Sequence, residues 1–246
     1  MNIVKPKITP ISNIDGNEAL RVIQRCAKTC YKSYKDTDDA ESAKRIIRNL
    51  IASGHTSLLE NYIITMNYIS NIAAYKDLTR SRIGFSYSIE SSRWCNYSKG
   101  KFGNQISFLD PVEIQDKRSK LYYVWVNAME KAEENYMLMS KLGATPDQLS
   151  LALPQSTAAE FNITGNLRAW KNLFDLRVLD KTGHARPCIH EIMDPTLELF
   201  HDKIPVVFDD QYEELQKKRA EQKYKEAQKL QLTIPFQELN TKTKGV

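Results

Sequence analysis

The sequence predicts an α/β fold, in which helices pack against a sheet. Two observations lead to this prediction. Segments whose apolar residues recur at helical spacing alternate with short runs rich in β-branched and aromatic residues, which are typical of strands. The longest helical pattern, residues 112–143, has the length of a central packing element or an oligomer contact.

The first half of the chain begins with a predicted edge strand. Residues 1–12 alternate apolar and polar side chains, and Pro6 and Pro10 limit their pairing. Further elements are expected as helices over residues 17–31, 38–53 and 71–78 and as a strand over residues 62–70. Cys26 and Cys30 lie four residues apart with no third ligand nearby, which favours core packing over a metal site.

The second half is mainly helical. Strands are expected over residues 105–109 and 156–164, and helices over residues 112–143, 145–153, 165–177 and 184–204. These elements complete a compact domain over residues 1–210. The remaining residues, 211–246, are rich in Glu, Lys, Arg and Gln, and they are expected to form a charged helical tail that is partly flexible.

Composition narrows the classes of protein. Of the 246 residues, 41% are hydrophobic and 26% are charged, which is ordinary for a soluble domain. No run of eighteen apolar residues and no signal-peptide block occurs, so no membrane partner is expected. Four cysteines in a chain of this length do not form a disulfide framework, and a cytoplasmic location is expected.

The distribution of charge along the chain indicates which kind of binding partner to expect. The net charge is +5, and residues 211–246 supply +3 of it, from eight basic and five acidic residues. The body therefore carries about +2, whereas nucleic-acid binding favours a concentrated basic face. Nucleic acid is not the expected partner, and an anionic small-molecule substrate is compatible with this balance.

The most informative stretch is TRSRIGFSYSIESSRWCNYS, residues 79–98. It contains Arg80, Arg82 and Arg93 together with five serines between residues 81 and 92. A guanidinium fork matches phosphate geometry, and hydroxyls add hydrogen bonds to the same oxygens. The stretch therefore predicts a loop that holds a mononucleotide phosphate or a dinucleotide pyrophosphate, with a solvated surface loop as the alternative.

Two more stretches carry polar side chains beside apolar runs. GHTSLLEN, residues 54–61, places His55, Ser57 and Glu60 between a helix and a strand, where functional loops are common. GNLRAWKNLFDLR, residues 165–177, has four polar candidates, which are Asn166, Arg168, Asn172 and Arg177. Arg177 ends an apolar run, so it either points back into a pocket or stabilises the helix C-terminus from solvent.

Together these stretches resemble the flavin-dependent thymidylate synthases. The matching motifs are residues 91–98, the Leu153-Pro154 pair, and Asn166-x-Arg168 followed by Asn172 and Leu176-Arg177. The resemblance covers residues 1–210. It implies an α+β fold with a twisted, mostly antiparallel sheet flanked by long helices, assembled as a homotetramer with active sites at subunit interfaces.

The resemblance also implies an activity. The enzyme would reductively methylate dUMP to dTMP, with methylenetetrahydrofolate as carbon donor, FAD as cofactor and NADPH as the source of reducing equivalents. No enzyme cysteine need attack the pyrimidine, and none of the four cysteines lies in a convincing Cys/His arrangement. No metal is implied.

Residue roles follow from the same resemblance. Arg177 would be the catalytic residue, because a buried cation contacting the uracil ring favours its polarised or ionised form. Residues implied in dUMP binding are Asp77, Arg80, Glu90, Ser91, Ser92, Arg93 and Arg177. Residues implied in the flavin and folate region are His55, Ser57, Glu60, Arg80, Ser81, Arg82, Asn166, Arg168 and Asn172.

The sequence departs from the family pattern at two informative positions. Ser81 replaces the histidine of an Arg-His-Arg triplet, and one extra residue separates this triplet from Ser91. Ser150 replaces an arginine that grips phosphate from a neighbouring subunit, a loss of about 1.5–3 kcal/mol if the bond is charge-assisted. Either Arg80 or Arg82 substitutes for it, or the substrate differs.

Two alternatives follow from these departures. One is a related flavin-dependent methylation or hydroxymethylation of another pyrimidine nucleotide. The other is a non-catalytic nucleotide-binding homologue.

Overall fold

The central element of the fold is a four-stranded antiparallel sheet. A computed structural model describes residues 1–33 and 39–242, with side chains up to residue 228. The strand order is β2 (Lys7–Pro10), β3 (Ile63–Asn71), β6 (Ala158–Asn166) and β4 (Phe85–Ile89). Strands β3 and β6 pair over their whole length, from Ile63 opposite Asn166 to Asn71 opposite Ala158. The mixed helix-and-sheet class and the mostly antiparallel sheet are thereby confirmed.

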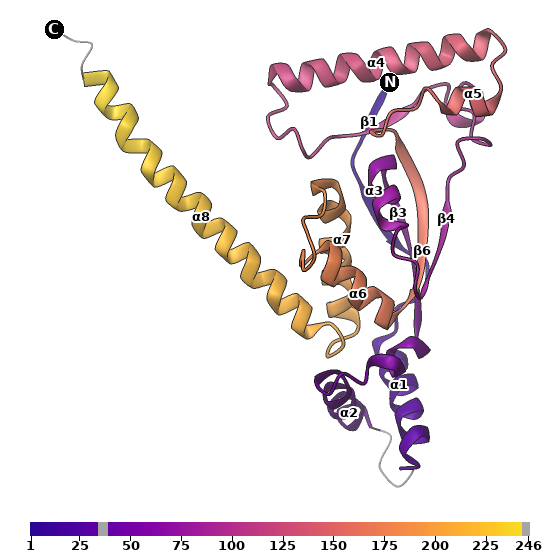
Figure 1. Ribbon diagram of the computed structural model, residues 1–246, viewed down its shortest axis with the longest axis vertical. Helices are drawn as coiled ribbons and strands as arrows, with labels where there is room; N and C mark the ends of the chain where they lie inside the picture. The colour runs from indigo at the N-terminus through magenta and orange to yellow at the C-terminus, as the bar shows by residue number, and fades with distance from the viewer. Residues whose placement is uncertain (34–38, 243–246) are drawn as a thin grey trace.

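Helices cover one face of this sheet. Helices α3 (Ile72–Leu78), α6 (Leu167–Arg177) and α7 (Pro187–Lys203) lie on that side in Figure 1. Alternate β3 residues Ile64, Met66 and Tyr68 are buried toward the helices. An aromatic cluster completes this core, with ring centroids 5.1–5.8 Å apart among Trp170, Phe174, Phe200 and Phe208. Each fully buried ring stabilises the fold by roughly 1.5–3 kcal/mol.

The other face of the sheet is polar. Asn67 on β3 donates to Asn162 on β6 at 2.8 Å, and the hydroxyls of Thr65 and Thr164 lie 3.0 Å apart. These cross-strand pairs follow the register of the two strands. The sheet therefore has an apolar face against the helices and a face of amides and hydroxyls.

Two helices close one end of the sheet. Helix α1 (Gly16–Tyr31) pairs with α2 (Ala40–Ala52), and the 3₁₀ segment η1 (Thr56–Asn61) links α2 to β3. Asp15 and Asp39 cap the two α-helices by accepting from backbone amides. The predicted start of the second helix at residue 38 lies outside the described residues.

A smaller module closes the opposite end. Strands β1 (Asn2–Val4) and β5 (Ser107–Leu109) form a parallel pair beneath helix α4 (Lys120–Lys141), and α5 (Pro146–Ser150) follows (Figure 1). Five side chains form its separate core, namely Ile106, Phe108, Met129, Tyr136 and Leu149. The short 3₁₀ turn η2 (Gly100–Phe102) lies in the segment that connects β4 to β5.

The C-terminal helix α8 (Asp209–Lys242) begins on the body and then projects away from it (Figure 1). Leu215 is buried, and the side-chain amide of Gln211 donates to the Lys171 carbonyl at 2.7 Å. Lys218 donates to the carbonyl of Leu179 at 2.7 Å. Helix α8 crosses the expected boundary between residues 210 and 211 without a break, and the division into domain and tail stays a prediction.

Several local predictions were wrong. Strand β4 lies inside the stretch that was expected to be a loop, because Phe85, Tyr87 and Ile89 face the helices in alternation with exposed serines. The edge strand is divided into β1 and β2 around residues 5 and 6. The long helix begins at Lys120, not at residue 112, because Ser119 caps it.

The cysteine prediction was also wrong. Cys30 is exposed and Cys26 is half-buried, because the buried stripe of α1 runs through Leu20, Ile23 and Ala27. The buried cysteine is Cys188 on α7. Within the described residues, no helix has both the length and the apolar composition that crossing a bilayer requires.

Candidate active site

The turn between α3 and β4 carries Arg80, Ser81 and Arg82. Both arginines are exposed, whereas the backbone of the turn is anchored from below. The Tyr87 hydroxyl on β4 lies 2.9 Å from the Leu78 carbonyl and 2.5 Å from the Ser81 carbonyl. One hydroxyl therefore fixes the turn on both sides of Arg80, and the two guanidinium groups are presented to solvent from a rigid base.

Gly84 brings this turn against the N-terminus of α6. Its φ is +78°, and an added Cβ would lie 2.8 Å from Cβ of Ala169 and 2.9 Å from Nδ2 of Asn166. A side chain at position 84 would be strained as well as crowded. The Asn166 amide donates to the Gly84 carbonyl at 3.3 Å, and the Asn166 side chain caps α6 at Ala169.

The segment η1 meets α6 at the same place. Glu60 and Arg168 form an ion pair at 2.6 Å, although both side chains are about half exposed. His55, which precedes η1, and Ser57 within it are both exposed, and Asn172 is exposed on α6. The structure therefore brings together the three sequence stretches that carry the flavin and folate candidates.

Arg177 lies at the C-terminal end of α6, beside the end of α3. It donates to the backbone carbonyl of Asp77 at 3.1 Å, and its buried Nε has no hydrogen-bond partner among the described residues. The Asp77 carboxylate instead binds Nε of Arg186 at 2.9 Å. Arg177 thus points back into the protein, which was one of the two orientations left open, and its charge is not paired by Asp77.

The pKa of Tyr87 is influenced by the charge of Arg177. Burial raises the pKa of Tyr87 to about 12, and the positive charge of Arg177 acts in the opposite direction. The phenol stays protonated at physiological pH and keeps its hydrogen for the carbonyls of the turn. Tyr87 and Arg186 were both missed in the sequence, which contains no spacing signal that links either of them to Arg177.

Ser91 and Arg93 lie at the other end of β4. The Ser91 carbonyl accepts from the amides of Trp94 and Cys95, both at 2.9 Å, and this forms a tight turn. Nε of Arg93 lies 2.6 Å from Asp147 on α5. Both side chains of this pair are about two-thirds exposed, so the pair is worth only roughly 0–1 kcal/mol.

Ser150 and Asp147 lie close together on α5, where the sequence departs from the family pattern. Ser150, which replaces the expected arginine, donates its hydroxyl to the Asp147 carbonyl at 2.7 Å. The carboxylate of Asp147 itself pairs with Arg93, so this chain has an acidic side chain beside that arginine. Asp147 was not among the sequence-predicted residues, because it lies 54 positions from Arg93.

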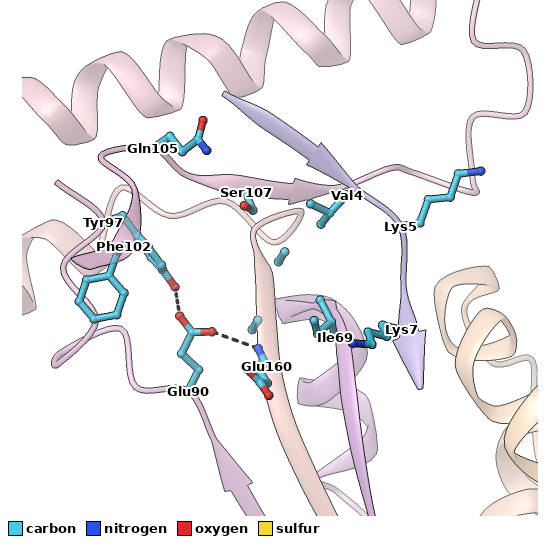
Figure 2. Close-up of a pocket in the computed structure, with 12 residues that line it drawn as sticks. Val4, Lys5, Lys7, Ile69, Glu90, Tyr97, Phe102, Gln105, Ser107 and Glu160 are labelled. Atoms are coloured by element: carbon cyan, nitrogen blue, oxygen red, sulfur yellow. Dashed lines mark hydrogen bonds between the residues drawn. The ribbon is translucent and has the colours of Figure 1, made fainter. Parts of the chain in front are cut away.

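Glu90 lines a pocket of about 320 Å³ to which β1 and β5 contribute Val4 and Ser107 (Figure 2). One carboxylate oxygen accepts from the Tyr97 hydroxyl at 2.6 Å and the other from the Glu160 amide at 3.1 Å. Burial and this carboxylate raise the pKa of Tyr97. The Ser92 side chain is half-buried beside this loop.

Strand β4 separates two groups of candidate residues. The arginine turn, with Asp77 and Arg177 nearby, lies before the strand, and Ser91 and Arg93 lie after it. Five strand residues span about 17 Å. Arg177 and Arg93 therefore lie beside opposite ends of this strand.

The arrangement fits an anionic dinucleotide. Exposed Arg80 and Arg82 flank a turn that touches the capped N-terminus of α6, and a helix N-terminus together with guanidinium groups favours phosphate. Nε of Arg177, which has no hydrogen-bond partner among the described residues, is a separate buried donor at the C-terminal end of α6. Among the described residues, no group of three His, Cys, Asp or Glu side chains is placed to bind a metal ion.

Comparisons with known proteins show which family this chain resembles. The family model described as thymidylate synthase complementing protein matches residues 13–206. A flavin-dependent thymidylate synthase of Corynebacterium aurimucosum is 26% identical over 206 residues, which cover 79% of this chain and 81% of that protein. One from Pyrococcus abyssi is 26% identical over 175 residues, which cover 67% of this chain and 70% of that protein.

A solved structure has the same fold. The UMP/dUMP methylase of Streptomyces cacaoi, bound with 5-Br dUMP, superimposes with a TM-score of 0.69. The match covers 85% of this chain and 96% of that chain at 20% sequence identity.

Proposed function

Because this chain belongs to the family of thymidylate synthase complementing proteins, we propose that it reductively methylates dUMP to dTMP with FAD, NADPH and methylenetetrahydrofolate. The observation that carries the proposal is the state of Arg177. Its guanidinium is held by a backbone carbonyl, is not neutralised by Asp77 and retains a buried N–H without a partner among the described residues. A donor of this kind is placed to stabilise negative charge on a bound ring.

Arg177 would act on the uracil. Its partly buried position lowers the local dielectric, so its charge acts more strongly than that of an exposed arginine. As negative charge develops on the pyrimidine, the guanidinium stabilises the polarised or ionised form of the ring. The backbone carbonyl of Asp77 would position Arg177 by accepting its hydrogen bond. Arg80 lies three residues later, on the turn that follows α3.

Ser91 and Arg93 would bind the nucleotide phosphate. The Ser91 hydroxyl and the Arg93 guanidinium are the donors, and the backbone near Glu90 and Ser92 shapes the turn. Without a bound nucleotide, the Arg93 guanidinium forms an ion pair with the Asp147 carboxylate. A phosphate carries more charge than one carboxylate, so it displaces Asp147 at small cost from this exposed pair.

The flavin would lie against the arginine turn, η1 and the start of α6. Arg80, Ser81 and Arg82 would face its phosphates, and Asn166, Arg168 and Asn172 would contact the dinucleotide from α6. His55, Ser57 and Glu60 would line the flavin and folate region. When bound and reduced by NADPH, the flavin supplies the hydride that completes the new methyl group.

The proposal includes a homotetramer with active sites at subunit interfaces. The separation of Arg177 from Arg93 by the length of β4 supports this assembly, because a second copy would complete the site. Residues 1–210 would form the catalytic domain and residues 211–246 the charged tail. A cytoplasmic location agrees with the nucleotide and folate substrates.

A different pyrimidine nucleotide is the second candidate. The Arg93–Asp147 pair and Ser150 favour it, because they alter the charge around the proposed phosphate site. Ser81 favours it because it changes the arginine turn where the family has a histidine. The structurally similar methylase from Streptomyces cacaoi acts on UMP as well as dUMP. Hydroxymethylation of a pyrimidine nucleotide and nucleotide binding without catalysis are further alternatives, and the same experiment distinguishes them.

Mass spectrometry of the products tests these readings together. The purified protein is incubated with methylenetetrahydrofolate, FAD and NADPH and with dUMP, dCMP or UMP. The proposal expects dTMP from dUMP as the major product. A methylated product from UMP or dCMP alone supports the second candidate, and dUMP binding without any product supports the non-catalytic homologue.

A further inference from the structure

Helix α8 packs beside α6 before it projects from the body (Figure 1). The Gln211 side chain donates to the Lys171 carbonyl at 2.7 Å and to the Asp175 carboxylate at 2.6 Å, and both partners are on α6. One turn further along α8, Leu215 is buried. Helix α8 begins at Asp209, after the family match, which ends at residue 206. The contact with α6 is therefore made by a part of the chain that lies outside that match.

Lys218 on α8 binds the backbone at the C-terminal end of α6. Its ammonium group donates to the Leu179 carbonyl at 2.7 Å and more weakly to the Val178 carbonyl at 3.5 Å. Val178 is the C-terminal cap residue of α6 and directly follows Arg177. The last carbonyls of a helix have no partner within the helix, so an ammonium group that binds the carbonyls at this end fixes the last turn.

The α6–α7 loop, residues 178–186, is held by the same lysine. Asp180 has a φ of +55°, a left-handed conformation that a residue with a side chain keeps only when neighbouring contacts hold it. One oxygen of its carboxylate accepts from the Ala185 amide at 2.9 Å. The other oxygen lies 3.5 Å from Nζ of Lys218. Lys218 thus binds the start of this loop through both its backbone and a side chain.

Both ends of the α6–α7 loop contact Asp77. Arg177, directly before the loop, donates to the Asp77 carbonyl at 3.1 Å, and Arg186 at the other end binds the Asp77 carboxylate at 2.9 Å. Nε of Arg177 has no hydrogen-bond partner among the described residues. The position of the Arg177 guanidinium therefore depends strongly on the backbone that carries it.

Arg219, next to Lys218, attaches α8 to α7. Its guanidinium contacts Glu198 and lies 3.5 Å from Asp194, and both acids are on α7. Helix α8 is thereby bound to the two helices that the loop connects. The side chains of Lys218 and Arg219 are 37–40% exposed, so their ion pairs alone add little stability. Their consequence is geometric, because they fix the place from which Lys218 reaches α6.

We propose that Lys218 positions Arg177 for methylation by binding the backbone at the end of α6. Lys218 is a positioning residue, since it acts through the backbone that follows Arg177. The inference rests on the proposed function, in which Arg177 acts on the uracil. The first turns of the predicted charged tail then serve the catalytic domain.

Replacement of Lys218 tests the proposal by steady-state kinetics of the FAD-loaded full chain. Lys218→Met keeps the length of the side chain and removes the ammonium group, and we expect kcat for dTMP formation to fall by about tenfold. The KM for dUMP should change by less than about twofold, because Ser91 and Arg93 are untouched. Lys218→Arg retains a charged donor and should recover most of the loss. Lys217→Met, at an exposed position on the same helix, is the control and should keep wild-type kinetics.

A double-variant cycle distinguishes positioning from a general loss of stability. If Lys218 acts through Arg177, then adding Lys218→Met to a chain that carries Arg177→Ala should lower kcat little further. A merely structural role would lower kcat by the same factor in both backgrounds. Equal factors, or an unchanged kcat in Lys218→Met alone, would overturn the proposal.

Amide hydrogen exchange tests the same contact without turnover. The amides of Leu179, Lys181 and Ala185 are hydrogen-bonded at the end of α6 and within the loop. In Lys218→Met they should exchange about tenfold faster, because the contact that holds this backbone is lost. The amides of β3 should keep their protection, which shows that the variant is folded, and Lys217→Met should match the wild type throughout. Unchanged exchange at the loop in Lys218→Met would overturn the proposal.

The two measurements separate this inference from the proposed activity. If the wild type makes no dTMP, the proposed activity fails, and the exchange measurement alone then decides whether Lys218 holds the end of α6.

Discussion

Arg177 donates to the backbone carbonyl of Asp77 at 3.1 Å and not to its carboxylate. The carboxylate is bound by Arg186 at 2.9 Å. Two arginines thus hold one aspartate from different sides, and only Arg186 has its charge neutralised by it. Arg186 thereby keeps the Arg177 guanidinium available for an anionic ligand.

Removal of Arg186 should release the Asp77 carboxylate to pair with Arg177. We expect Arg186→Gln to lower kcat/KM for dUMP by about tenfold, equivalent to roughly 1.4 kcal/mol. Asp77→Asn in the same chain should recover most of this loss, because no carboxylate then competes. Arg118→Gln, at an exposed position, serves as the control. An additive double variant would show that the pair is merely structural.

Truncation of Arg177 should affect chemistry more than flavin binding. Arg177→Ala removes the buried donor, and we expect kcat to fall by about 10²–10³, the typical cost of one preorganised donor. The variant should retain its flavin, because the proposed flavin residues lie on the arginine turn, η1 and the start of α6. Initial rates of dTMP formation and the flavin content of the same preparation are the measurements. Unchanged turnover would remove Arg177 from its role.

Asp147 should oppose phosphate binding. In Asp147→Asn the Arg93 guanidinium no longer has a carboxylate partner, so we expect the KM for dUMP to fall several-fold while kcat changes little. The expected gain is small because the ion pair is exposed and worth about 0–1 kcal/mol. Asp202→Asn, at an exposed position on α7, is the matched control. A higher KM would mean that Asp147 positions Arg93 instead of competing for it.

His190 should make stability depend on pH. Nδ1 of its ring lies 2.9 Å from Asp194 and Nε2 lies 3.5 Å from Asp180, and these acids raise the pKa of His190 above 6.5. The folded state therefore favours the protonated ring. Its contribution to stability is fully present below pH 6.5 and is lost as pH rises through the folded pKa.

Urea unfolding at several pH values measures this contribution. His190→Gln should flatten the pH dependence of the unfolding free energy as pH rises above 6.5. His184→Gln provides the control, because that ring is 99% exposed. A wild-type stability that rises through this range would contradict the assignment.

The main elements of the fold could be predicted because their patterns are long. Strand β3 has nine residues whose burial alternates from Ile63 to Ser70, and α6 has a buried stripe followed by Arg177 at its end. Strand β4 could not be predicted in the same way. Its alternating Phe85, Tyr87 and Ile89 lie within an arginine- and serine-rich stretch whose composition favours a loop.

Candidate site residues could be named from the sequence only where a motif contains them. Ser91, Arg93 and Arg177 lie in recognisable stretches, and the structure places them at the two ends of β4. Their charged partners come from distant parts of the chain. Asp147 is 54 positions from Arg93, and Arg186 is 109 positions from Asp77, so only the tertiary fold brings them together.

The central claim is flavin-dependent methylation of dUMP. Its most direct test is the absorbance spectrum of the FAD-loaded protein, reduced anaerobically with NADPH and then mixed with dUMP and methylenetetrahydrofolate. The account predicts that the oxidised-flavin band returns only when both substrates are present, with one dTMP formed per flavin reoxidised. Protein that binds no flavin, or a band that stays bleached with both substrates present, would contradict it.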